Sequence, residues 1–155
     1  MPDAPRSVVI VAYPDVQSLD VSGPAEVFAA ASAHGATPPY DLTVLSSAGR
    51  QIRATSGLRF VADATVAQHD GPIDTLVVAG GDGIISVALQ ALALGDVPLG
   101  VIPAGTGNDH AREYRLPTGD PEAAADVVAD GWAENVDLGR IVNRDGVTKW
   151  FGTVM

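Results

Sequence analysis

The 155-residue chain contains no cysteine. This absence excludes a disulfide framework, a thiolate metal site and a cysteine nucleophile. Basic residues are also scarce, with 9 Lys and Arg against 19 Asp and Glu, so the formal net charge is −10. Because such a charge repels phosphate backbones and anionic membrane surfaces, we expect no nucleic-acid partner.

Long apolar runs are missing as well. No segment reaches the roughly 18 uninterrupted apolar residues of a membrane span, and the amino terminus lacks the apolar core of a signal peptide. We therefore expect a cytoplasmic protein without a membrane span. With 46% hydrophobic residues, the chain is long enough to bury a core and short enough to form a single domain over residues 1–155.

What the sequence does contain is an alternation of strand-like and helix-like segments. We expect strands at 7–13, 40–45, 74–79 and 99–102, and helices at 24–33, 84–94, 108–115 and 120–129. The first helix is expected to begin at Pro24, because proline suits the first helical position, and Asp120 is expected to cap the last. Short, continuous apolar strands of this kind are typical of parallel sheets covered on both faces.

Two further pairs of segments predict antiparallel additions to this sheet. Residues 51–54 and 58–62 flank a short turn and predict an accessory hairpin, and the turn at 143–146 predicts a C-terminal antiparallel pair. The sequence thus predicts a three-layer α/β/α sandwich, flavodoxin- or Rossmann-like, with a mostly parallel central sheet. Strand 74–79 should lie between strands 7–13 and 99–102.

Glycine-rich loops follow two of the expected strands. One loop comprises Gly80, Gly81, Asp82 and Gly83, and the other comprises Gly105, Thr106, Gly107, Asn108 and Asp109. Glycines let backbone amides approach a phosphate, and a helix start favours its charge. Thr106 could donate its hydroxyl and Asn108 could cap the following helix. A single glycine cluster is often only a tight turn, but two in one sheet are more specific.

The second half of the chain carries GGDG at 80–83, PLGVIPAGTGND at 98–109 and VDLGR at 136–140. These motifs resemble the catalytic domain of diacylglycerol kinases, within the NAD kinase/diacylglycerol kinase-like group. The resemblance implies that ATP is contacted by Gly80, Gly81, Asp82, Gly83, Gly105, Thr106, Gly107, Asn108 and Asp109. Ile84 stands where the family has a threonine, so the phosphate loop lacks a hydroxyl. The resemblance also implies a β-rich second domain with the lipid site, which we do not expect in this chain.

The first half carries VVIVAYPDVQSLDVSGPAEVF at 8–28, SSAG at 46–49, SGL at 56–58 and DTLVVAGG at 74–81. It resembles the PfpI and isocyanide hydratase group of the class I glutamine amidotransferase-like superfamily, which has a flavodoxin-like fold. The resemblance implies that Asp20 works beside a cysteine on a later strand-to-helix elbow, where 103–105 stand here. Because no cysteine exists, we expect Asp20 to be a solvated or hydrogen-bonded carboxylate without a catalytic role.

These two resemblances divide the chain at 1–79 and 80–155, and we interpret it as an engineered chimera without complete catalytic machinery. On this interpretation it has no enzymatic activity, no catalytic residue and no required cofactor. A second hypothesis is a module that binds ATP or phosphate weakly, with magnesium, through the two glycine loops. A third is an active enzyme, either a PfpI-type hydrolase or hydratase or a lipid kinase. The sequence leaves open whether the chain forms a homodimer.

The remaining polar candidates are weak. His34, His69 and His110 have no second ligand at metal spacing, so we assign no metal site and expect solvated histidines. Arg112 and Arg115 follow the second loop and could meet a phosphate, but a surface position is the simpler expectation.

Overall fold

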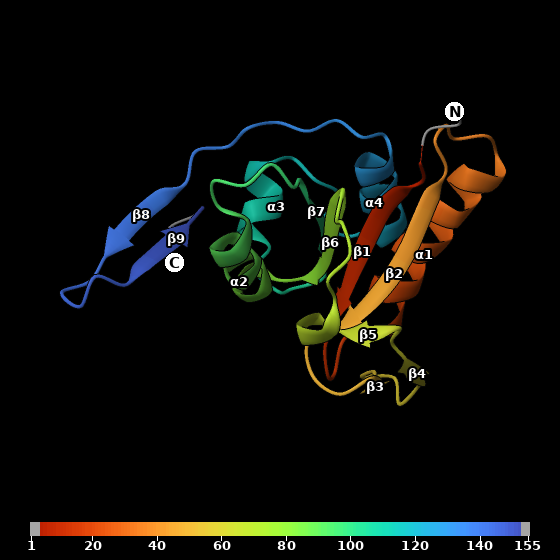
Figure 1. The fold of residues 1–155 in the computed structure, drawn as a ribbon, viewed down its shortest axis with the longest axis horizontal. Helices are drawn as coiled ribbons and strands as arrows, with labels where there is room; N and C mark the ends of the chain where they lie inside the picture. The colour runs from red at the N-terminus through yellow and green to blue at the C-terminus, as the bar shows by residue number, and fades with distance from the viewer. Residues whose placement is uncertain (1–3, 153–155) are drawn as a thin grey trace.

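The computed structural model describes residues 4–152, which form a five-stranded parallel sheet with flanking helices (Figure 1). The strand order is β5-β2-β1-β6-β7, and every pairing in this sheet is parallel. The strands are β1 (Arg6–Ala12), β2 (Tyr40–Ser46), β5 (Ala64–Thr65), β6 (Thr75–Gly80) and β7 (Leu99–Pro103). β6 lies between β1 and β7, which confirms the predicted order.

Helices cover both faces of the sheet, as the sequence predicts (Figure 1). On one face, α1 (Ser18–Ala33) and α4 (Pro121–Ala129) pack on the larger core cluster, which includes Phe28 and Ile102. On the other face, α2 (Asp82–Leu92) packs against Val101 of β7, and α3 (Asp109–Glu113) lies beside it. The predicted three-layer α/β/α architecture is confirmed.

The start of α1 differs from the prediction. The helix begins at Ser18, six residues before Pro24, which therefore lies inside it. Proline in a helix interior lacks the N–H that would bond to the carbonyl of Asp20. Val21, Pro24 and Phe28 are all buried and follow helical spacing along one face. Burial of this face outweighs the local preference for proline at a helix start.

Two other helices end earlier than expected. α2 ends at Leu92, because the chain turns at Leu94, which has a φ of 67° and is 89% exposed. α3 covers only five residues and ends before Arg115, which also has a positive φ of 56°. In both cases a left-handed residue stops the helix earlier than the apolar pattern indicates.

Both predicted antiparallel pairs are present. β3 (Gln51–Arg53) pairs with β4 (Arg59–Val61), and β8 (Gly139–Val142) pairs with β9 (Thr148–Phe151). The β8–β9 hairpin projects from the body of the molecule beyond α2 (Figure 1). Strand β5 and the 3-10 helix η1 (Val66–Gln68) were not predicted. None of the helices within residues 4–152 has the length and apolarity to cross a membrane.

Candidate functional site

The two glycine-rich loops meet at the carboxyl edge of the sheet, where β6 and β7 end. Their backbones touch through two glycines: a Cβ on Gly81 would lie 2.9 Å from the Cα of Gly105, and a Cβ on Gly105 would clash with Gly81. The amide of Ala104 also donates a hydrogen bond of 3.1 Å to the carbonyl of Gly80. Only residues without a side chain allow this approach, so the glycines join the two loops.

Asp82 joins the loops with its side chain. Its carboxylate accepts hydrogen bonds from the backbone N–H of Asp109 (3.0 Å) and of His110 (3.0 Å), and one from His110 Nδ1 (2.8 Å). Burial by itself would raise the pKa of this carboxyl, but the two backbone donors and the His110 ring lower it to about 2. Asp82 is therefore ionised and fixes the start of α3 against the first loop.

His110 is buried, in contrast to the predicted solvated histidine. It is 1% exposed, and its ring is close to Gly152, where a Cβ would lie 2.9 Å from Nε2. Since an ionised carboxylate can only accept hydrogen bonds, Nδ1 donates to Asp82. Within residues 4–152 the buried Nε2 has no hydrogen-bond partner. The prediction was wrong because His110 and Asp82 come together only when β6 and β7 pair.

The sequence predicts that Asn108 caps α3. In the structure its side chain closes the second loop on itself. Its Oδ1 accepts from the N–H of Gly105 (2.8 Å) and its Nδ2 donates to the carbonyl of the same residue (2.6 Å). The backbone of Asn108 is left-handed, with a φ of 55°, and its side chain makes no bond to the helix start. The carboxylate of Asp82, from the neighbouring loop, accepts the hydrogen bonds of the first N–H groups of α3 instead, so the cap comes from a residue distant in sequence.

The other predicted loop residues divide into buried and exposed groups. Gly80 is buried beneath Ile84 and the Tyr13 hydroxyl, which its missing side chain allows to approach. The exposed loop residues are Gly83, Thr106, Gly107 and Asp109. No side chain within residues 4–152 caps the start of α2 beside them, and the first N–H groups of a helix have no partner within it. This surface can therefore present amides to an anion.

Arg112 also lies at this edge, on the surface as expected. Its side chain is 58% exposed and donates a hydrogen bond of 2.8 Å to Asp109, which is 62% exposed. An exposed pair of this kind is weak and is easily exchanged for another partner. The guanidinium is thus available near the loops.

Asp20 occupies a different environment near the carboxyl end of β1. It is only 3% exposed, and burial raises its pKa. Tyr13 donates a hydrogen bond of 2.9 Å to the carbonyl of Ala79, and burial followed by the charge of Asp20 raises the pKa of its phenol. Among residues 4–152, no hydrogen bond reaches the Asp20 carboxylate. Asp20 is therefore buried and not freely solvated, because α1 starts early enough to place it inside the fold.

No metal centre is assembled by the described part of the chain. Residues 4–152 bring no three His, Asp or Glu side chains into positions from which they could share an ion.

Comparison with known families identifies one match. The diacylglycerol kinase catalytic domain matches residues 36–141, about two thirds of the chain. The diacylglycerol kinase of Mycobacterium tuberculosis is 65% identical over 81 residues, which cover 52% of this chain and 26% of that protein. That of Bacillus subtilis is 40% identical over 93 residues, or 57% of this chain and 31% of that protein. The matched region thus spans about a quarter to a third of these relatives.

Solved structures resemble the fold at low sequence identity. An AraC family transcriptional regulator from Pseudomonas putida superposes with a TM-score of 0.59 at 19% identity, over 81% of this chain and 88% of that one. DJ-1beta from Drosophila melanogaster superposes with a TM-score of 0.52 at 18% identity, over 65% of this chain and 56% of that one. At such identities the likeness establishes the fold alone. The chain therefore combines a kinase family match with a DJ-1-like arrangement of strands and helices.

Proposed function

We propose, because this chain belongs to the diacylglycerol kinase catalytic domain family, that it is a phosphate- or nucleotide-binding module of that type. The observation that carries the proposal is the contact between the two glycine loops beside the uncapped start of α2. In this arrangement the phosphates of ATP or ADP, with magnesium, rest against the exposed loop residues Gly83, Thr106 and Gly107.

The polar groups around this surface limit the affinity. Asp82 and Asp109 repel an incoming phosphate, and the whole chain carries a net charge of −10. Arg112 offsets part of this repulsion when it turns from Asp109 to the ligand. Ile84 has an apolar side chain that packs over Gly80 and supplies no hydroxyl to the ligand. We expect a Kd of about 1 mM, which corresponds to about −4 kcal/mol.

The two carboxylates have different roles in this proposal. Asp82 holds the second loop in place through its bonds to Asp109 and His110. Asp109 lies at the surface, where removing its charge frees Arg112 for a phosphate. Asp109→Asn should therefore strengthen binding of phosphate slightly and leave the fold unchanged.

An NMR titration of the whole chain tests the proposal. Phosphate, ADP and Mg-ATP at millimolar concentrations should shift the amide signals of Gly81, Gly83, Thr106 and Gly107. The informative variant is Gly83→Ala, because nothing lies within 4 Å of a Cβ at this position. The added methyl group leaves the fold intact but occupies space in front of the amides, and should weaken binding several-fold.

Gly119→Ala is the matched control, since a Cβ there also meets nothing within 4 Å. It lies outside both loops and should bind as the unchanged chain does. If none of the three ligands moves the four amide signals, the loops bind no phosphate and the proposal is wrong.

The second candidate is a chimera of two families without turnover. It is favoured by the buried Asp20, which corresponds to the acid of the PfpI group but has no cysteine to act on. The kinase family match begins at residue 36, within the segment 1–79 that resembles the PfpI group. Absence of ligand binding together with a stable fold would favour this candidate. Hydrolysis or hydration by the unaltered chain that is lost in Asp20→Ala would instead favour a PfpI-type activity.

A further inference from the structure

The projecting hairpin of β8 and β9 exposes apolar side chains to solvent. Ile141 is 59% exposed, Val142 49% and Val147 53%. The hairpin forms its own two-stranded sheet, and within residues 4–152 no strand pairs with the outer edge of β8. On the outer side of β9, the side chain of Gln90 bonds to both the N–H (2.9 Å) and the carbonyl (2.7 Å) of Trp150. The hairpin is therefore held firmly to α2 while its free edge and apolar side chains remain uncovered.

The charge of this hairpin is opposite to that of the rest of the molecule. Residues 139–151 contain three basic side chains, Arg140, Arg144 and Lys149, and one acidic side chain, Asp145. The segment thus carries a net charge of +2 in a chain whose net charge is −10. All three basic residues are exposed. A basic, apolar projection on an acidic protein fits an acidic, apolar partner surface.

A surface of that kind lies between α1 and α4. These helices border a groove of about 960 Å³, within the range of about 300–1,000 Å³ typical of ligand sites. Apolar residues such as Leu19, Val27 and Ala30 line it. Leu19 is 66% exposed. The exposed acidic side chains along the groove are Glu26, Asp120, Glu122, Asp126 and Asp130. Among residues 4–152, no Lys or Arg lines the groove.

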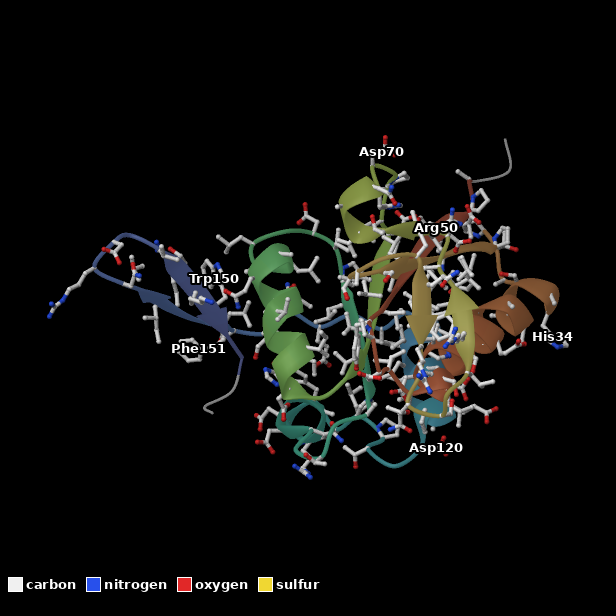
Figure 2. All side chains as sticks on the ribbon, turned by 90° about the horizontal axis from the view of Figure 1, so that it is seen from below. His34, Arg50, Asp70, Asp120, Trp150 and Phe151 are labelled. Atoms are coloured by element: carbon white, nitrogen blue, oxygen red, sulfur yellow. The ribbon has the colours of Figure 1, made fainter. Side chains whose placement is uncertain are left out.

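The hairpin cannot reach this groove within one molecule. Figure 1 shows β8 and β9 at one end of the molecule and α1 at the other. Figure 2 shows the same separation in a second view, with Trp150 and Phe151 on the hairpin and His34 and Asp120 on the far side. The two complementary surfaces of a chain can therefore meet only in different copies.

We propose that this protein associates head to tail, with the β8–β9 hairpin of one copy seated in the α1–α4 groove of a second copy. The basic side chains of the hairpin face the acidic rim, and its exposed valines and isoleucine cover the apolar floor. Because the two surfaces differ, a pair of copies keeps one free hairpin and one free groove, so the assembly grows into a chain or closes into a ring. The proposal concerns surfaces away from the glycine loops and is independent of nucleotide binding.

Light scattering after size-exclusion chromatography tests this association with the full chain. The mass should rise with protein concentration from the micromolar to the millimolar range at low ionic strength. It should fall as salt is added, because salt screens exposed charges. A monomer at every concentration and low salt would contradict the proposal.

Two charge-reversal variants test which surfaces meet. The hairpin variant is R140E/R144E/K149E, and the groove variant is E26K/E122K/D126K, which spares the capping Asp120. Each should be monomeric by itself. Mixed in equal amounts, they should associate, because the unaltered hairpin of the groove variant meets the unaltered groove of the hairpin variant. This contact alone gives a heterodimer of twice the monomer mass.

The mixture therefore also shows whether the altered surfaces pair, since that second contact would extend the assembly beyond a dimer. Either product supports the proposal, and a mixture that stays monomeric overturns it. Association that survives in the groove variant but not in the hairpin variant indicates hairpin-to-hairpin pairing and also overturns it.

The matched control is D70K/E113K/E134K, which changes the net charge as the groove variant does but at exposed acids outside the groove. It should associate as the unchanged chain does. Loss of association in this control would show that the net charge of the chain, and not the groove, controls association. Circular dichroism confirms that each variant is folded, and the neutral set R140Q/R144Q/K149Q provides a second hairpin variant with reduced association.

Discussion

Two aspartates near the carboxyl edge of the same sheet have pKa values that are shifted in opposite directions. Asp82, after β6, accepts three hydrogen bonds from the neighbouring loop, and its pKa falls to about 2. Asp20, after β1, is buried without a hydrogen bond to its carboxylate from residues 4–152, and its pKa rises. The comparison shows that burial raises the pKa of one carboxyl, while N–H donors lower the pKa of the other.

The surroundings of the two carboxylates at this edge of the sheet differ in the same way. Around Asp82, two glycine loops and a helix start converge and are held by charged hydrogen bonds. Around Asp20, the phenol of Tyr13 bonds to the carbonyl of Ala79 instead of to the carboxylate. An ionised Asp20 therefore costs stability, whereas an ionised Asp82 contributes to it.

The largest effect is expected from Asp82→Ala. The substitution removes three hydrogen bonds and leaves the His110 ring and two backbone N–H groups without their acceptor, so we expect a loss of about 2–4 kcal/mol in the free energy of unfolding. Urea unfolding followed by circular dichroism measures it. Asp109→Ala is the control, because its exposed carboxylate bonds to the exposed Arg112 and should matter by less than about 0.5 kcal/mol. Equal effects would mean that the glycine contact alone joins the loops.

The second effect is the loss of stability in acid. Asp82 has a folded pKa of about 2, below its ordinary value of 3.8, so its contribution is complete above pH 3.8 and is lost as the pH falls toward 2. At about 1.4 kcal/mol for each pKa unit, and with solvent screening at this partly exposed site, the loss amounts to at most about 2 kcal/mol. Urea unfolding across this pH range should show a smaller acid loss in Asp82→Ala than in the unchanged chain. Identical slopes would contradict the assignment.

The smallest effect, and the one of opposite sign, is expected from Asp20→Asn. Because burial raises the pKa of Asp20, the ionised form is disfavoured in the folded state, and this stability is lost as the pH rises through the raised pKa. The uncharged amide should therefore increase the free energy of unfolding at neutral pH, and the gain should vanish in acid. Asp41→Asn, at an exposed position of β2, should change little. A destabilised Asp20→Asn would reveal a favourable partner of the carboxylate.

Local patterns were sufficient for most of the fold. Continuous apolar runs predicted β1, β6 and β7 and their order, since such strands must be buried on both faces. The turn signals predicted both antiparallel pairs. The start of α1 was misplaced, because the burial of Val21 and Phe28 is invisible to a rule based on Pro24. The two-residue strand β5 has too few residues to give any pattern.

The candidate site was predicted in its composition but not in its bonding. The glycine loops were identified because glycines after strands allow close backbone approach. Asn108 was expected to cap α3, but Asp82 from the other loop does so. His110 was expected in solvent, but it is buried against Asp82. The cap and the buried histidine share one cause, since Asp82 lies 27 and 28 positions from the two residues whose N–H groups it binds. The side chain of Asn108 is instead occupied by Gly105, three positions away.

The sequence by itself determined the layered α/β architecture, the excess of negative charge, the absence of thiol chemistry and the position of the two glycine loops. These properties depend on composition and on short-range periodicity, which are present in the unfolded chain. Only the tertiary structure decided that Asp82 is stabilised as an anion, that Asp20 is buried, and that the basic hairpin lies far from the acidic groove. Each of these depends on which distant segments the paired strands bring together, and therefore on the desolvation and hydrogen bonding that follow from packing.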